Sequence, residues 1–255
     1  MKSHKFLLML SILLSSNIIY GHSITPQSHL PYISLPHLCS LPVHVEFEDV
    51  AKKVVPTITY AKLLEDINGY RKNEVVEVLA DVGKGTHYQV QSPTLCTWIP
   101  RYSFEFLPYN NVDVEPLNSY ELELFVNNSD FSSETFYFIW VDLARQMVYI
   151  FFGDEGNWSL HKQFICSTGK QETSTVRGIF YIKERGEELR TTEYAKYWVK
   201  FQNNYLFHST PLDENGNVAD PTLGKPASAG CVRLHLNDAL WFYENIPKYS
   251  TVWVN

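Results

Sequence analysis

Short runs of apolar residues, separated by turn-forming residues, make up most of the chain, and this pattern is typical of β-strands. In the first half, the runs predict strands at 75–79, 88–91 and 97–99, with a tight turn at Gly83-Lys84-Gly85. In the second half, they predict strands at 136–141, 147–152, 158–166, 178–182, 197–201, 205–208 and 251–254. We therefore expect a mainly β protein with longer strands in its second half.

Two short helices are expected among these strands. Residues 120–125 place Glu-Leu-Glu-Leu between two aromatic residues, which predicts a connecting helix that Asn118 or Ser119 can cap. A second helix is predicted over 238–245, with Asn237 as its N-cap and Pro247 beyond its end.

The N-terminal residues have the order of a secretory signal. Lys2 and Lys5 precede an apolar run at 6–14, and small and polar residues lead to Gly21. The run is shorter than the roughly 20 apolar residues that span a bilayer. We predict a signal peptide at 1–21, cleaved near Gly21 or Ser23, and the alternative is an uncleaved anchor extended by residues 18–20.

The remaining residues divide by pattern into four segments. Residues 22–42 are rich in Pro, Ser and His and predict a linker, and residues 43–117 predict a small β-rich domain. Residues 118–134 form a helical connector, and residues 135–255 form the domain with long strands. Two interpretations of 43–117 stay open, a small β-barrel or an irregular β-rich packing domain.

Composition narrows the class of protein. The 255 residues are 45% hydrophobic and 19% charged, which excludes wholesale disorder. Lys and Arg total 21 against 28 Asp and Glu, a net charge of −7, so nucleic acid is not an expected partner. Four Cys are too few for a disulfide scaffold. The sequence allows one disulfide among Cys39, Cys96 and Cys166 but does not assign its two members. No Cys and His residues have the close spacing of a metal site.

The candidate chemistry lies at His208-Ser209 and in the segment Ser228-Ala229-Gly230-Cys231-Val232-Arg233. Acyl transfer through a cysteine needs a thiolate, a base and donors for an oxyanion. Because a free thiol is only a few per cent ionised at neutral pH, a partner such as His208 is required for Cys231. Gly230 allows a substrate to approach the backbone closely, and Arg233 offers a planar fork that suits a carboxylate.

This order of His followed by Ser-x-Gly-Cys-x-Arg resembles the catalytic signature of the bacterial L,D-transpeptidases. The likeness runs from about 136 to 255 and includes Ile139-Trp140-Val141-Asp142-Leu143, Cys166-Ser167-Thr168-Gly169-Lys170 and Leu223-Gly224-Lys225-Pro226-Ala227-Ser228. The resemblance implies a β-rich L,D-transpeptidase catalytic domain with a short helix after the catalytic Cys. Residues 43–117 in turn resemble the bacterial Src-homology-3-like modules that accompany cell-wall enzymes.

By this resemblance, Cys231 is the nucleophile and His208 is its general base. The amides of Gly230 and Cys231 are the expected oxyanion donors, and Ser228 and Arg233 shape the site, while Ser209 beside His208 is a further site residue. The family cleaves the L–D peptide bond of a stem tetrapeptide, releases D-alanine and passes the acyl group to an amine of a second stem, forming a 3-3 cross-link. It implies no cofactor and no metal.

The resemblance also predicts partners and location. The expected partners are peptidoglycan stem peptides, with glycan contact by the N-terminal domain as an open question, and the expected location is the periplasm or cell wall. After signal cleavage no membrane association is expected.

One departure from the family pattern leaves the activity open. The family usually has His where this chain has Ala229, and His235 is a substitute only if the turn after Cys231 is helical. Two alternatives therefore remain, an L,D-carboxypeptidase that passes the same acyl-enzyme to water, and a catalytically idle wall-binding protein.

Overall fold

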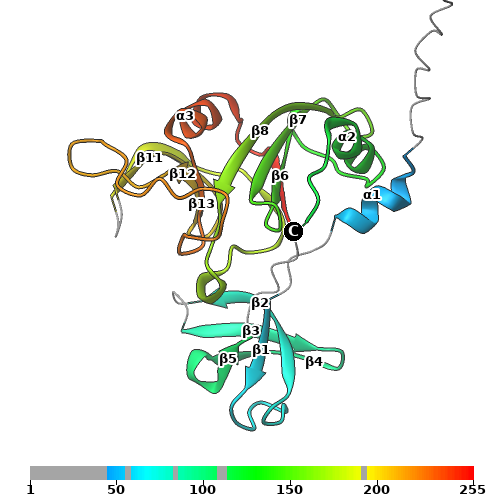
Figure 1. The fold of residues 1–255 in the computed structure, drawn as a ribbon, viewed down its shortest axis with the longest axis vertical. Helices are drawn as coiled ribbons and strands as arrows, with labels where there is room; N and C mark the ends of the chain where they lie inside the picture. Colours follow the sequence, from blue (N-terminus) through cyan, green and yellow to red (C-terminus); the bar gives the residue numbers. More distant parts are fainter. Residues whose placement is uncertain (1–44, 55–58, 83–85, 108–113, 191–193) are drawn as a thin grey trace, which may run out of the picture. The chain divides into compact units, whose positions relative to one another are not determined.

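The computed structural model describes residues 45–54, 59–82, 86–107, 114–190 and 194–255, and Figure 1 shows their fold. The predicted signal peptide (1–21), the linker (22–42), Cys39 and the turn at 83–85 lie outside these residues. Within the described ranges, no helix is long and apolar enough to cross a membrane.

The first half contains a five-stranded antiparallel sheet with the strand order β4-β3-β2-β1-β5. The strands are β1 (Thr59–Leu63), β2 (Val75–Val82), β3 (His87–Ser92), β4 (Leu95–Pro100) and β5 (Phe104–Phe106). Buried and more exposed residues alternate along β1, so Ala61 and Leu63 point into the core of this sheet. The same core contains Val76, Val90 and Phe104.

The second half contains a nine-stranded sheet with the order β10-β11-β12-β13-β8-β7-β6-β14-β9. The strands are β6 (Tyr137–Asp142), β7 (Met147–Phe152), β8 (Ser159–Ser167), β9 (Gly178–Tyr181), β10 (Arg185–Arg190), β11 (Tyr194–Gln202), β12 (Tyr205–Ser209), β13 (Val232–Leu234) and β14 (Thr251–Val254). Two neighbouring pairs are parallel, β12 with β13 and β14 with β6, and the others are antiparallel. Each parallel pair joins strands that are distant in sequence.

Both faces of the large sheet are buried around β6, which explains why β6 is apolar at nearly every position. Ile139 and Val141 point into one core, and Phe138 and Trp140 point into a second core on the opposite face. The first core lies under α3 (Leu236–Asn245), which packs against β11 and β12. The second core includes residues of α1 (Phe47–Lys53) and α2 (Ser119–Asn127).

Helix α2 begins with a reciprocal hydrogen-bonded cap. The Asn118 side chain accepts from the Glu121 amide at 3.0 Å, and the Glu121 carboxylate accepts from the Asn118 amide at 2.9 Å. This confirms Asn118 as the cap and satisfies two backbone groups that the helix itself leaves unpaired.

The mainly β class is confirmed, and the structure extends or corrects several elements. The strands predicted at 75–79, 88–91 and 97–99 lie within β2, β3 and β4, and the structure adds β1, β5, β10, β13 and α1. The last helix begins at Leu236 and its N-cap is His235, not Asn237 as predicted. Helix α1 falls inside the segment predicted as β-rich, and its Val50 belongs to the same core as Leu122 of α2.

Candidate active site

The parallel pairing of β12 with β13 brings the two halves of the sequence motif together. Phe207, His208 and Ser209 lie opposite Val232, Arg233 and Leu234. Because successive strand residues face opposite sides, the buried Phe207, Val232 and Leu234 point into the α3-side core. His208 and Arg233 therefore face the other side of the sheet.

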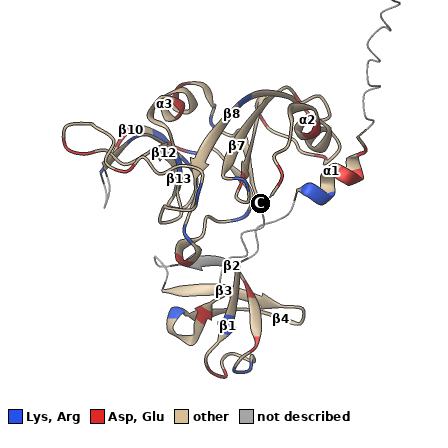
Figure 2. Cartoon of the chain, viewed as in Figure 1, with Lys and Arg blue, Asp and Glu red and all other residues tan. Residues whose placement is uncertain are grey.

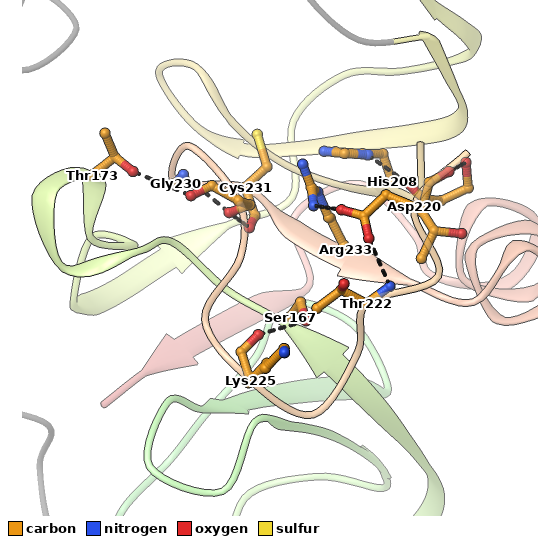
Figure 3. Close-up of polar contacts among 12 residues, drawn as sticks. Ser167, Thr173, His208, Asp220, Thr222, Lys225, Gly230, Cys231 and Arg233 are labelled. Atoms are coloured by element: carbon orange, nitrogen blue, oxygen red, sulfur yellow. Dashed lines mark hydrogen bonds and ion pairs between the residues drawn. The ribbon is translucent and has the colours of Figure 1, made fainter. Parts of the chain in front are cut away.

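Cys231 directly precedes β13 and lies two positions before Arg233. Cys231 is partly exposed, and its thiol donates a weak hydrogen bond to the carbonyl of Asn204, with an S···O distance of 3.6 Å. Figure 3 shows the sulfur on the same side of the sheet as the imidazole ring.

The imidazole of His208 is held in one tautomer. His208 is buried, and its Nδ1 lies 2.7 Å from the carbonyl oxygen of Ser209. Since a carbonyl oxygen only accepts, Nδ1 carries a proton, and in the neutral ring Nε2 therefore carries the lone pair. In Figure 3 this second nitrogen points toward Cys231. The ring thus has the orientation that a general base for the thiol requires.

The Ser209 side chain forms hydrogen bonds with the backbone of β11 and of the residue that follows β12. Its buried hydroxyl accepts from the Lys196 amide at 3.0 Å and donates to the Thr210 carbonyl at 2.9 Å. The hydroxyl therefore fixes the end of β12 against β11, close to the carbonyl that orients His208.

The turn before Cys231 is organised by Ser228. The Ser228 hydroxyl donates to the Cys231 carbonyl at 2.6 Å and accepts from the Gly230 amide at 3.0 Å. Gly230 has a φ of +116°, and a Cβ at this position would lie 2.9 Å from a ring carbon of Tyr205. The structure brings Gly230 to the site, but its amide donates to Ser228 and not into the space above the thiol.

Two threonines after β8, Thr173 and Thr175, also hold this turn, and no motif in the sequence predicts them. The Thr175 hydroxyl accepts from the Gly169 amide at 2.9 Å and donates to the Gly230 carbonyl at 2.8 Å. The Thr173 hydroxyl donates to the Ser228 carbonyl at 3.2 Å. These residues lie more than 50 positions from Cys231, so no local spacing in the sequence indicates the contact.

Arg233 is paired within the protein. Its guanidinium is buried, and Nη1 donates to Oδ2 of Asp220 at 3.0 Å, an ion pair that Figure 3 shows beside His208. Hydrogen bonds from Thr222, and then the charge of Arg233, hold the pKa of Asp220 below its usual range. Asp220 was not predicted, and the only local signal is an Asp-Pro-Thr sequence typical of a turn.

The profile of the YkuD family, described as the L,D-transpeptidase catalytic domain, matches residues 136–254. Residues 136–254 are therefore similar to that catalytic domain. The "Putative L,D-transpeptidase YciB" of Bacillus subtilis strain 168 is 38% identical over 128 residues, which cover 45% of this chain and 64% of the relative. The chain therefore matches less than two thirds of the relative's length.

Solved structures similar to the chain include a fused Zn-dependent amidase/peptidase/peptidoglycan-binding domain-containing protein from Clostridium acetobutylicum. It is 35% identical with a TM-score of 0.47, over 54% of this chain and 59% of that protein. The catalytic domain of an L,D-transpeptidase from E. faecium is 20% identical with a TM-score of 0.38, over 47% of this chain and 96% of that domain.

The structure describes the two positions that concern the missing motif histidine, Ala229 and His235. Ala229, where the family usually has His, is exposed, and the orientation of His208 depends on Ser209 instead. The predicted substitute, His235, requires a helical turn after Cys231, but residues 232–234 form strand β13. The ring of His235 instead accepts a hydrogen bond from the Asn237 amide at the start of α3.

The other two cysteines in the described residues are not part of the candidate site. Cys96 is an exposed free thiol, and Cys166 is a buried one whose pKa is raised, first by burial and then by the charge of Asp142. Within the described ranges, no three His, Cys, Asp or Glu side chains cluster as a metal site would require.

Proposed function

We propose that the protein is a peptidoglycan L,D-transpeptidase in which Cys231 is the nucleophile and His208 is the general base. The observation that carries this proposal is the parallel pairing of β12 with β13, with His208 opposite Arg233 and Cys231 on the same side of the sheet. The proposal also assigns the protein an extracytoplasmic location, in keeping with the apolar run at 6–14 that follows two lysines.

The first half-reaction forms an acyl-enzyme. Nε2 of His208 takes the Sγ proton of Cys231, and the sulfur attacks the carbonyl carbon of the L–D bond of a stem tetrapeptide. The C–N bond then breaks, and D-alanine leaves with the proton held by His208. We assign stabilisation of the oxyanion to the Cys231 amide, because the Gly230 amide already donates to Ser228.

The second half-reaction transfers the acyl group. An amine of a second stem attacks the thioester carbonyl while His208 accepts the amine proton, and the C–S bond breaks to restore the Cys231 thiol. The product is a 3-3 cross-link. If water attacks in place of the amine, the same site is an L,D-carboxypeptidase, so the two activities differ only in the acceptor.

The test incubates the purified protein with disaccharide tetrapeptides and follows products by mass spectrometry. We expect D-alanine and cross-linked dimers, loss of both in Cys231→Ala, and a loss of about 10²–10⁴-fold in His208→Gln. Cys96→Ala is the matched control and retains the activity. Tripeptide without dimer assigns the carboxypeptidase activity instead. Dimer formation by Cys231→Ala at the unaltered rate contradicts the proposal.

A further inference from the structure

The connection between β12 and β13 returns to the site and places a carboxylate there. Residues 210–231 lead from one strand to the other, and Asp220 within them pairs with Arg233 at 3.0 Å. Asp220 is itself fixed, because its Oδ1 accepts from the Thr222 amide at 3.0 Å. The carboxylate therefore lies at a defined position and not at the end of a mobile side chain.

The two members of this ion pair differ in their exposure to water. The Arg233 side chain is 4% exposed and the Asp220 side chain is 42% exposed. Because water screens an exposed charge more than a buried one, the negative end is weakened more than the positive end. The pair therefore presents a net positive field to the side chains beside it.

Those neighbours are the two candidate catalytic side chains. His208 lies directly opposite Arg233, and Cys231 lies two positions before it. In the view of Figure 3, the guanidinium lies between the thiol and the imidazole. A positive charge beside a thiol favours its ionised form, which is the nucleophile.

The neighbouring strands and loops also carry charged side chains, whose places along the chain Figure 2 shows. On the other side of β13, β8 presents uncharged Ser167 opposite Arg233. On β11, Lys200 pairs with Glu184 at 2.8 Å, and Lys196 lies on the same face, beyond β12. The nearby loops carry two more lysines, Lys170 and Lys225.

We propose that Asp220 is a positioning residue that holds the Arg233 guanidinium beside Cys231 and His208, so that a buried positive charge favours the Cys231 thiolate. This inference rests on the proposed role of Cys231 as nucleophile. It replaces the expected carboxylate-binding role of Arg233, because the guanidinium is buried and its Nη1 is committed to Asp220.

The experiment measures the rate of Cys231 alkylation by iodoacetamide between pH 5 and about 10, with peptide mapping to separate the cysteines. In Asp220→Asn the guanidinium loses the partner that holds it and moves away from the thiol, and this outweighs the loss of the negative charge of Asp220. We therefore expect the midpoint of the Cys231 profile to move to higher pH by about 0.5 unit or more, with a rate at neutral pH lowered about threefold or more. Asp220→Glu, which keeps the charge, restores most of the profile.

Asp213→Asn is the matched control. Asp213 lies in the same connection and also accepts hydrogen bonds that lower its pKa, but its partners are local, first Asn217 and then Asn215 and Gly216. We expect its alkylation profile to match the unaltered protein. A thermal unfolding scan of each variant separates a loss of stability from a change in thiol reactivity.

Three outcomes contradict either this inference or the proposed role of Cys231 as nucleophile. If Asp220→Asn unfolds at a lower temperature but keeps the Cys231 midpoint, Asp220 is only structural and the inference fails. If Asp220→Asn does not fold, the double variant Asp220→Asn, Arg233→Gln removes both charges together, and an unaltered midpoint there also overturns it. If Cys231 of the unaltered protein reacts like the exposed Cys96 at every pH, the proposed function fails first.

Discussion

Gly230 is the residue whose backbone most directly sets the position of Cys231. Its positive φ is costly for other residues, and Tyr205 leaves no room for a side chain. The carbonyl on one side of the turn is held by Thr175, and the amide on the other is held by Ser228. A displaced Gly230 therefore displaces the thiol.

We predict that Gly230→Ala lowers the D-alanine release rate by about 100-fold, because a shift of about 1 Å at a reacting group has this effect. Gly216→Ala is the matched control, since Gly216 also has a positive φ but a Cβ there meets nothing within 4 Å. We expect the control to keep its activity. Equal losses in both variants would show that backbone strain alone is responsible.

At the scale of single residues, the sequence predicts the candidate catalytic pair but not the residues that hold this pair in position. Cys231 and His208 are recognisable because the motif is local. Asp220, Thr173 and Thr175 reach the site only through the fold, and their spacing from Cys231 follows no rule. The commitment of the Gly230 amide to Ser228 depends on dihedral angles that a sequence pattern does not specify.

Among the secondary-structure elements, the turn between β6 and β7 is tied to β8 by one buried amide. The Gln146 side chain donates to the Leu143 carbonyl and to the Thr168 hydroxyl, both at 2.7 Å, and accepts from the Thr168 amide at 2.9 Å. Thr168 in turn accepts from the amides of Ala227 and Ser228. Gln146 therefore connects a hairpin to the turn that leads to Cys231.

We predict that Gln146→Ala lowers the free energy of unfolding by about 2–3 kcal/mol, because it leaves buried donors and acceptors unpaired. Urea denaturation at neutral pH measures the change. Gln163→Ala, on the exposed side of β8, is the control, and we expect it to change stability by less than about 0.5 kcal/mol. A similar small change in Gln146→Ala would mean that water replaces the lost bonds.

The strands that the sequence pattern predicted most clearly are buried and apolar, whereas the strands that it missed are short or polar. The apolar runs of β6 and β7 are strong signals because both faces of the sheet are buried there. Strand β13 has only three residues, and β10 (Arg-Gly-Glu-Glu-Leu-Arg) is largely polar, so neither shows a hydrophobic period. Their strand conformation comes from their neighbours in the sheet.

At the scale of the whole molecule, a partly buried ion pair joins helix α1 to helix α2. The Lys53 ammonium of α1 lies 2.7 Å from the Glu121 carboxylate of α2. Burial opposes ionisation of Glu121, but hydrogen bonds from Lys53 and the Asn118 amide outweigh it, so the pKa of Glu121 is lowered. A lowered pKa in the folded state stabilises the fold above the unfolded pKa, and this stability is lost as the pH falls through the folded value.

We predict that the free energy of unfolding decreases as the pH falls below about 4.5, the usual pKa of a glutamate side chain, and that Lys53→Met makes this decrease smaller. Urea denaturation at a series of pH values measures the slope. Lys52→Met is the control, because Lys52 contacts only the exposed Asp49. If both variants keep the slope of the unaltered protein, other carboxylates determine the acid sensitivity.

The position of β14 has a consequence for how the molecule is made. This strand contains residues 251–254, yet it lies inside the large sheet, between β6 and β9. While a ribosome is still adding these residues, β6 lacks its parallel partner and the core beneath α3 lacks Val252 and Val254. A nascent chain that already contains Cys231 therefore still lacks part of the core of the sheet that carries this residue.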